Sequence, residues 1–206
     1  MSTGDDAEAG GGPLSGRRGG RYADEPALVV AVQEGDRAAF SVLVHRYMEP
    51  AYAVSISLLH REQDAEDAVQ AAFLRALEKI DQLRPGSPFG PWFYRVLRST
   101  CLNLRRREAL RTHEAMAVEP AGRSDPASDL ERKEMRQRLL EALEQVPEAQ
   151  RLAVLLYDLE GYDHTEIAEI LEIASGTSRA NLHHGRRALR EILGAESGEA
   201  DEPKGD

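Results

Sequence analysis

Apolar residues recur every three or four positions along most of this chain, a spacing that places them on one face of an α-helix. Within residues 36–61 the stripe consists of Phe40, Leu43, Val44 and Tyr47. Within residues 64–80 it returns as Val69, Phe73, Ala76, Leu77 and Ile80. The sequence contains no convincing alternation of apolar and polar residues, the pattern that marks a β-strand. We therefore predict an all-α fold.

Stretches without this periodicity divide the chain. Residues 111–130 contain two prolines and no apolar stripe, which is typical of a linker. We therefore expect one helical domain over 27–110 and a second over 131–194. Residues 1–26 are rich in glycine, and residues 195–206 are mostly acidic. Such segments bury too little apolar surface to offset the entropy of ordering, so both are predicted to be disordered.

Prolines and capping residues predict where the helices begin and end. Pro26 and Pro91 suit the first turn of a helix, where the missing amide proton costs little. Pro50 falls inside a helical stripe, so we expect it to kink or divide that helix. Asp64 is expected to cap the helix that follows it, and Gly161 to end a later one.

The composition excludes several classes of protein. Cys101 is the single cysteine, so no disulfide can form within the chain. No apolar run approaches the roughly 20 residues that cross a bilayer, and we expect a cytoplasmic protein without membrane insertion. The net charge of −10 argues against nucleic acid on average, but the last twelve residues hold five acids and one lysine, which supply −4. Local basic patches therefore remain possible binding surfaces.

Residues 163–193 have the spacing of a helix-turn-helix motif. Asp163 and Glu166 stand three positions apart before an apolar run, as in a capping box. A second helix follows, for which Ser175 is a candidate cap. At 100° per residue, the side opposite Leu182 carries Thr177, Ala180, His184 and Arg187, flanked by Arg179 and His183. This surface could enter a major groove, or it could merely complement the negative end of the helix dipole.

An enzymatic alternative would use a metal ion. His60, Asp64 and Asp67 could lie on one side of a helix and act as ligands. The sequence offers no second ligand cluster, and an acidic helix start explains these carboxylates more simply. We therefore expect no enzyme activity, no cofactor and no metal.

Three segments together resemble the extracytoplasmic-function group of the bacterial sigma-70 family. They are DAEDAVQAAFLRA at 64–76, PFGPWFYRVLRSTCLNLRRR at 88–107, and the stretch from LLEALEQVPEAQ to GRRALREIL at 139–193. The resemblance covers about residues 27–194 in the family's order. It implies that the first domain, similar to sigma region 2, binds the clamp of core RNA polymerase and melts the −10 promoter element. The second, similar to region 4, would read the −35 element.

The resemblance also assigns residues to roles. The surface for the polymerase clamp would be Asp64, Glu66, Asp67 and Gln70. The −10 element would be contacted by Leu83, Ser87, Phe89, Arg95, Arg98, Ser99, Arg105 and Arg106, the first three forming a pocket for a flipped base. The −35 element would be contacted by Thr177, Arg179, Asn181, His183, His184 and Arg187. Ser178 stands where the family usually has a core valine, and Glu172 where it has a turn glycine.

Two further expectations concern partners. The resemblance implies an anti-sigma factor that clamps the two domains and hides both DNA surfaces. The competing interpretation is a helix-turn-helix regulator that binds duplex DNA without polymerase. Such a regulator needs a dimer seam to match two half-sites, and the sequence contains no sustained heptad pattern.

Overall fold

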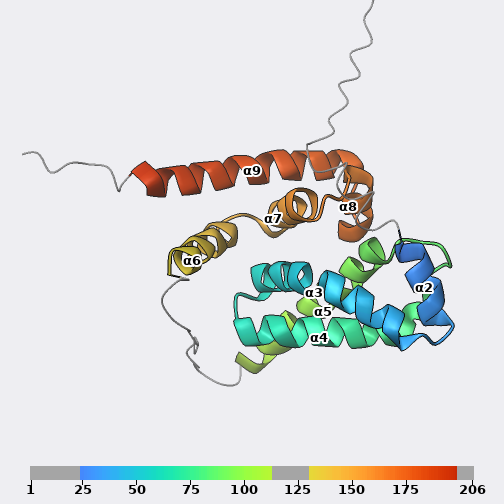
Figure 1. The fold of residues 1–206 in the computed structure, drawn as a ribbon. Helices are drawn as coiled ribbons and strands as arrows, with labels where there is room; N and C mark the ends of the chain where they lie inside the picture. Colours follow the sequence, from blue (N-terminus) through green and yellow to red (C-terminus); the bar gives the residue numbers. More distant parts are fainter. Residues whose placement is uncertain (1–23, 113–129, 199–206) are drawn as a thin grey trace, which may run out of the picture.

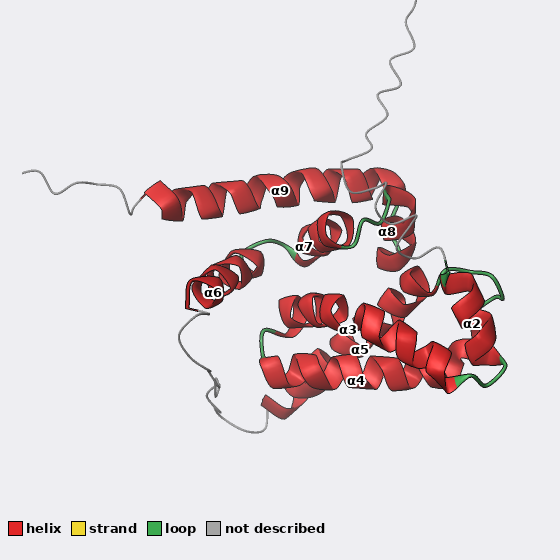
Figure 2. Ribbon diagram, in the orientation of Figure 1, coloured by secondary structure: helices red, strands yellow, loops and turns green. Residues whose placement is uncertain are grey.

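The structure, a computed structural model, describes residues 24–112 and 130–198, and every regular element in these ranges is helical (Figures 1 and 2). The first domain comprises α2 (Glu25–Gln33), α3 (Arg37–Leu59), α4 (Glu62–Lys79), the 3-10 turn η1 (Ile80–Gln82) and α5 (Phe89–Thr112). The second comprises α6 (Leu130–Glu144), α7 (Glu148–Val154), the π-helical turn η2 (Leu155–Leu159), α8 (His164–Leu171) and α9 (Ser175–Gly198). The all-α prediction is confirmed.

Several boundaries differ from those expected. Most of the segments 1–26, 111–130 and 195–206 lies outside the described residues, but the ends of each are helical. α5 continues to Thr112 and α9 to Gly198, beyond the predicted domain ends. α9 passes through Gly194 without a break, so this helix continues beyond the predicted end of its domain.

The structure agrees with some of the predicted helix starts and ends and differs at others. Pro26 occupies the first turn of α2, and Gly161, with a φ of 73°, follows η2. Asp64 is not a cap, because α4 already begins at Glu62 with Arg61 at the N-cap. Of the two effects expected at Pro50, a kink or a division, the division does not occur: α3 runs through this proline, and its packing against α4 and α5 outweighs the loss of one backbone hydrogen bond.

Aromatic side chains fill the core of the first domain. Tyr47 of α3 lies 5.4 Å from Phe89 and 5.7 Å from Phe93, measured between ring centroids. Phe93 also stacks on Phe89 at 5.2 Å and on Phe73 of α4 at 4.5 Å. Aromatic pairs at these separations contribute about 0.5–1.5 kcal/mol beyond their buried area. The cluster ties α3, α4 and α5 together and orients α5.

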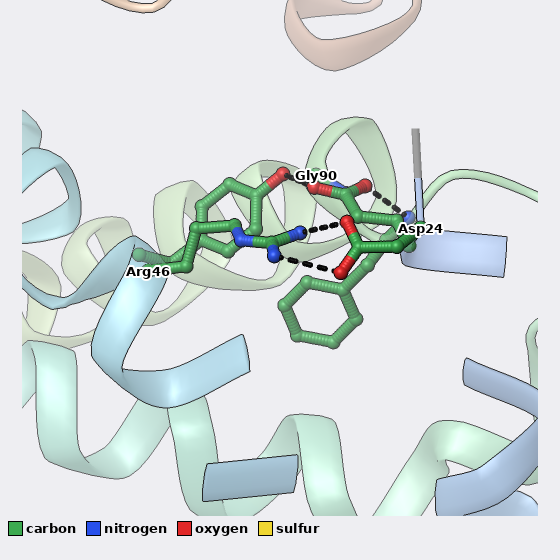
Figure 3. A network of polar contacts seen from close by, with 6 residues as sticks. Asp24, Arg46 and Gly90 are labelled. Carbon is green, nitrogen blue, oxygen red and sulfur yellow. Dashed lines mark hydrogen bonds and ion pairs between the residues drawn. The ribbon is translucent and has the colours of Figure 1, made fainter. Parts of the chain in front are cut away.

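A buried carboxylate joins the start of the domain to this core (Figure 3). Glu25 is fully buried and accepts hydrogen bonds from the Tyr47 hydroxyl, from the Phe89 amide at 3.0 Å and from the Gly90 amide at 3.4 Å. Phe89 and Gly90 begin α5, whose first amides lack partners within the helix. Beside them, Asp24 accepts two hydrogen bonds from Arg46, which lower the pKa of Asp24. Glu25 therefore belongs to the folded domain, ahead of its predicted start at residue 27.

The two domains share one apolar core. Six residues of the second domain belong to the same buried cluster as the aromatic residues of α3 and α5: Leu152, Leu156, Tyr162, Ile167, Ile170 and Leu171. α8 packs against α5, as Figure 1 shows. Tyr94 of α5 meets Tyr162 edge to face, with 5.5 Å between ring centroids. The domains that a linker separates in the sequence are thus in direct contact.

No helix in the described ranges is long and apolar enough to span a membrane.

Candidate functional site

The acidic first turn of α4 divides into a paired carboxylate and an exposed face. Asp64 is partly buried, and its Oδ2 lies 3.4 Å from Arg61 Nη1. Burial raises the pKa of Asp64, and the nearby Glu108 carboxylate adds to this shift. Glu66, Asp67 and Gln70 are exposed. Three of the four residues expected at the polymerase surface are therefore available to a partner, whereas Asp64 is engaged within the domain.

Two leucines extend this exposed face. Leu74 is 64% exposed and Leu77 is 43% exposed. At 100° per residue they lie within 80° of Asp67 and Gln70 around α4. The expectation that Leu77 belongs to the core stripe is wrong, because α3 and α5 cover a narrower face of α4 than the periodicity suggests. Exposed leucines bordered by polar residues are typical of a protein interface.

A cleft between α3 and α4 adjoins the same face. Its volume is about 730 Å³, and its lining includes His45, Met48, Glu49, Tyr52, Glu66 and Gln70. Glu66 and Gln70 thus belong both to the exposed face of α4 and to the lining of this cleft, most of whose other lining residues come from α3. Sequence periodicity does not reveal this cleft, because it depends on how two helices cross.

The three residues expected to bind a flipped base lie in the loop before α5 and at the first position of that helix. Ser87 is half-buried, but Leu83 is only 7% exposed and Phe89 is completely buried. Phe89 packs between Tyr47 and Phe93, so its ring cannot stack on a base in this structure. Gln33 of α2, which the sequence did not suggest, anchors the loop by donating to the carbonyl oxygen of Leu83 at 2.7 Å.

The polar residues expected on α5 form two rows. Arg95, Ser99 and Arg106 are exposed and lie within 40° of one another around the helix. Arg98 and Arg105 lie on a neighbouring row that faces the second domain. Arg105 Nη1 is 2.9 Å from the Glu148 carboxylate of α7, and Arg98 Nη2 is 3.8 Å from it. The helix therefore presents one open row and one row paired across the domain boundary.

The second domain contains the expected helix-turn-helix geometry in α8 and α9. The capping box of Asp163 and Glu166 is confirmed, with Asp163 accepting from the Thr165 and Glu166 amides. Glu172 has a φ of 58°, so a non-glycine residue does occupy the left-handed turn position. Ser178 is fully buried, and its Oγ lies 3.1 Å from His164 Nδ1. This hydrogen bond allows a hydroxyl to take a core position.

α9 separates a buried side from an exposed basic side. Leu182 is buried, and the exposed residues of the helix include five of those expected to contact the −35 element: Thr177, Arg179, His183, His184 and Arg187. Asn181 is half-buried at the edge of this surface. Arg186 instead turns back to pair with Asp158, and its guanidinium lies 5.2 Å from the centre of the Tyr157 ring. Arg186 therefore holds the domain together, and the others remain accessible.

Comparisons with known proteins place both domains in one family. The family models for sigma-70 region 2 and sigma-70 region 4 match residues 43–111 and 136–189. The ECF RNA polymerase sigma-E factor of Escherichia coli (strain K12) is 32% identical over 173 residues, which are 79% of this chain and 90% of that protein. This chain belongs to the extracytoplasmic-function group of the sigma-70 family. It is a sigma factor that directs promoter-specific transcription initiation by RNA polymerase.

Further relatives agree with this assignment. The ECF RNA polymerase sigma factor SigE of Mycolicibacterium smegmatis is 31% identical over 184 residues, 85% of this sigma factor and 71% of that protein. The solved structure of the sigma factor RpoE with the anti-sigma factor NepR from Bartonella quintana is 25% identical, with a TM-score of 0.64 over 75% of this chain and 96% of that one. CnrH, solved with the cytosolic domain of CnrY, shares the fold at a TM-score of 0.63 and 22% identity, over 83% and 97% of the two chains.

The competing interpretations do not fit this sigma factor. A regulator that works without polymerase is set aside by the match to both sigma regions. The three side chains weighed as metal ligands point to different partners. His60 Nδ1 lies 2.9 Å from Glu144 of α6, Asp64 faces Arg61, and Asp67 is exposed on α4.

Proposed function

We propose that this sigma factor reads the −35 element with the exposed side of α9. The supporting observation is that Arg179, His183 and His184 are exposed on α9, with His184 opposite the buried Leu182 and the other two flanking that side. An arginine in the major groove can donate two hydrogen bonds to O6 and N7 of guanine. Arg187 lies farther along the helix, where a side chain contacts backbone phosphates and positions the protein.

We propose that α4 binds the clamp of core polymerase through Glu66, Asp67 and Gln70, with Leu74 and Leu77 as apolar contacts. Asp64 acts indirectly by pairing with Arg61 at the start of the helix. The −10 surface is then the exposed row Arg95, Ser99 and Arg106 of α5, with Ser87 in the preceding loop and Arg98 and Arg105 in the adjacent row. Leu83 and Phe89 position this loop from within the core.

The protein's own role in this scheme is binding rather than catalysis. Phosphodiester formation belongs to core polymerase, and the sigma factor supplies promoter recognition in the cytoplasm, where transcription takes place. We also propose an anti-sigma partner that covers the DNA surfaces. The similarity to RpoE, whose solved structure contains the anti-sigma factor NepR, supports this partner.

The function is tested by transcription with core polymerase, with and without the protein, on promoters that differ only at −35 and at fixed salt. Arg179→Ala is expected to cost about 1–3 kcal/mol of discrimination between −35 variants if its contact with guanine is bidentate. Arg187→Ala is the matched control, and it should weaken initiation to a similar degree on every variant. Equal loss on all promoters with Arg179→Ala would show that Arg179 acts electrostatically, and no loss would move the recognition surface elsewhere.

A further inference from the structure

Three acidic residues of the second domain bind polar groups of the first. Glu148, at the start of α7, accepts from Arg105 at 2.9 Å and lies 3.8 Å from Arg98. Glu144, at the end of α6, is 2.9 Å from His60. Glu160, which follows η2, accepts from the Tyr94 hydroxyl at 3.0 Å. Each contact joins residues more than 40 positions apart and crosses the domain boundary.

The contact at Glu148 resembles a phosphate contact in its chemistry. A carboxylate held between two guanidinium groups offers the same charged oxygen acceptors as a DNA phosphate. Arg98 and Arg105 belong to the −10 surface proposed above, and their side chains are 28% and 50% exposed. While Glu148 occupies them, these two arginines cannot neutralise a backbone phosphate.

The buried part of the boundary strengthens this contact. Tyr162 is 1% exposed, although it lies in the second domain, because it packs against Tyr94 of the first. Glu160 is 4% exposed and is satisfied by the Tyr94 hydroxyl. An exposed ion pair alone contributes little to stability, whereas apolar burial around a hydrogen-bonded carboxylate holds two surfaces in register.

Promoter geometry requires this arrangement to open. The −10 and −35 elements are separated by roughly 25 base pairs, or about 85 Å of duplex at 3.4 Å per base pair. A chain of this length folded into one compact body has a radius of gyration of about 15–17 Å. Domains in contact through Glu148 therefore cannot occupy both elements at once.

We propose that the second domain autoinhibits the first, with Glu148 acting as an internal substitute for a DNA phosphate on Arg98 and Arg105. The inference rests on the proposed −10 role of these arginines. In the free protein the closed state lowers affinity for DNA, and binding to polymerase and promoter separates the domains. The acidic second domain thus covers Arg98 and Arg105 of α5 until polymerase and promoter DNA are both present.

The experiment uses the full chain without polymerase and a fluorescein-labelled single-stranded DNA of mixed sequence, since phosphate contacts do not depend on sequence. Glu148→Gln should raise affinity for this DNA by about two- to fivefold, the range expected when ion pairs of this exposure are lost. Small-angle X-ray scattering should show an unchanged radius of gyration, because the apolar burial around Tyr94 and Tyr162 still holds the domains together. Glu141→Gln is the matched control: it makes the same charge change on α6, where Glu141 accepts from Gln137 of its own helix.

Two outcomes would overturn the proposal. One is that Glu148→Gln and Glu141→Gln bind this DNA with the same affinity, and the other is an expanded Glu148→Gln chain whose DNA affinity is unchanged. Adding Arg98→Ala and Arg105→Ala to Glu148→Gln should abolish the gain, and its persistence would also contradict the masking of these arginines. Failure of the −10 assignment itself is detected separately, as undiminished initiation by holoenzyme that carries only the two arginine changes.

Discussion

At the scale of single residues, His164 couples the recognition helix to pH. Its Nδ1 lies 3.1 Å from Ser178 Oγ, and its ring stacks on Tyr157 with 5.0 Å between centroids. Burial lowers the pKa of His164 below its ordinary value of 6.5, and the positive charge of Arg179 lowers it further. The unfolded chain therefore takes up a proton before the folded chain does as the pH falls.

This histidine should make the protein less stable in mild acid. Its contribution is fully present well above pH 6.5 and is lost as the pH falls from this unfolded value through the lower pKa of the folded state. Replacing His164 with Gln should flatten the fall in melting temperature between pH 7.5 and 5.5, measured by circular dichroism. His45→Gln, which alters an exposed histidine on α3, is the control and should keep the wild-type slope. Parallel slopes for all three proteins would exclude His164 as the group responsible.

At the scale of elements, one glycine sets how closely α9 approaches α7. A Cβ added to Gly185 would lie 2.8 Å from the Gln150 carbonyl oxygen and 2.8 Å from Val154 Cγ2. Because the first of these atoms belongs to the backbone of α7, the helices would have to move apart. Gly185→Ala should lower the free energy of unfolding by about 1–3 kcal/mol, measured by urea denaturation.

Gly194→Ala, in the same helix, is expected to change the stability in the opposite direction. A Cβ at Gly194 has no neighbouring atom within 4 Å, so only the gain in helix propensity remains. That gain is up to about 1 kcal/mol, and the variant should be slightly more stable than the wild type. Destabilisation of equal size by both variants would show that the α7–α9 distance is not the cause.

At the scale of the whole molecule, the exposed face of α4 predicts how the protein meets core polymerase. Asp67→Lys should weaken core binding in a pull-down while helicity stays unchanged, because Asp67 is exposed. Glu34→Lys makes the same charge change at an exposed acid that follows α2, and it should bind normally. Asp64 is less suitable for this test, because reversing its charge would also break the contact with Arg61. Undiminished binding by Asp67→Lys would remove this face from the interface.

The sequence by itself determined the features that depend on neighbours within a few positions. Helical periodicity predicted the all-α fold, and the Asp163–Glu166 capping box formed as expected because its partners are three residues apart. The motif order also identified the family and the exposed basic side of α9. Periodicity and capping are properties of one helix or of one turn, and the motif order is a property of the linear sequence, so none of these features requires knowledge of the packing.

Only the tertiary structure decided which residues face a neighbouring element. Phe89 is in the core because Tyr47 and Phe93 surround it, and Leu77 is exposed because neighbouring helices do not cover it. The pairing of Glu148 with Arg105 joins residues 43 positions apart and has no local signal. Periodicity relates residues around a single helix axis, whereas burial and ion pairing depend on the position of a second helix, which arises from the packing of the entire chain.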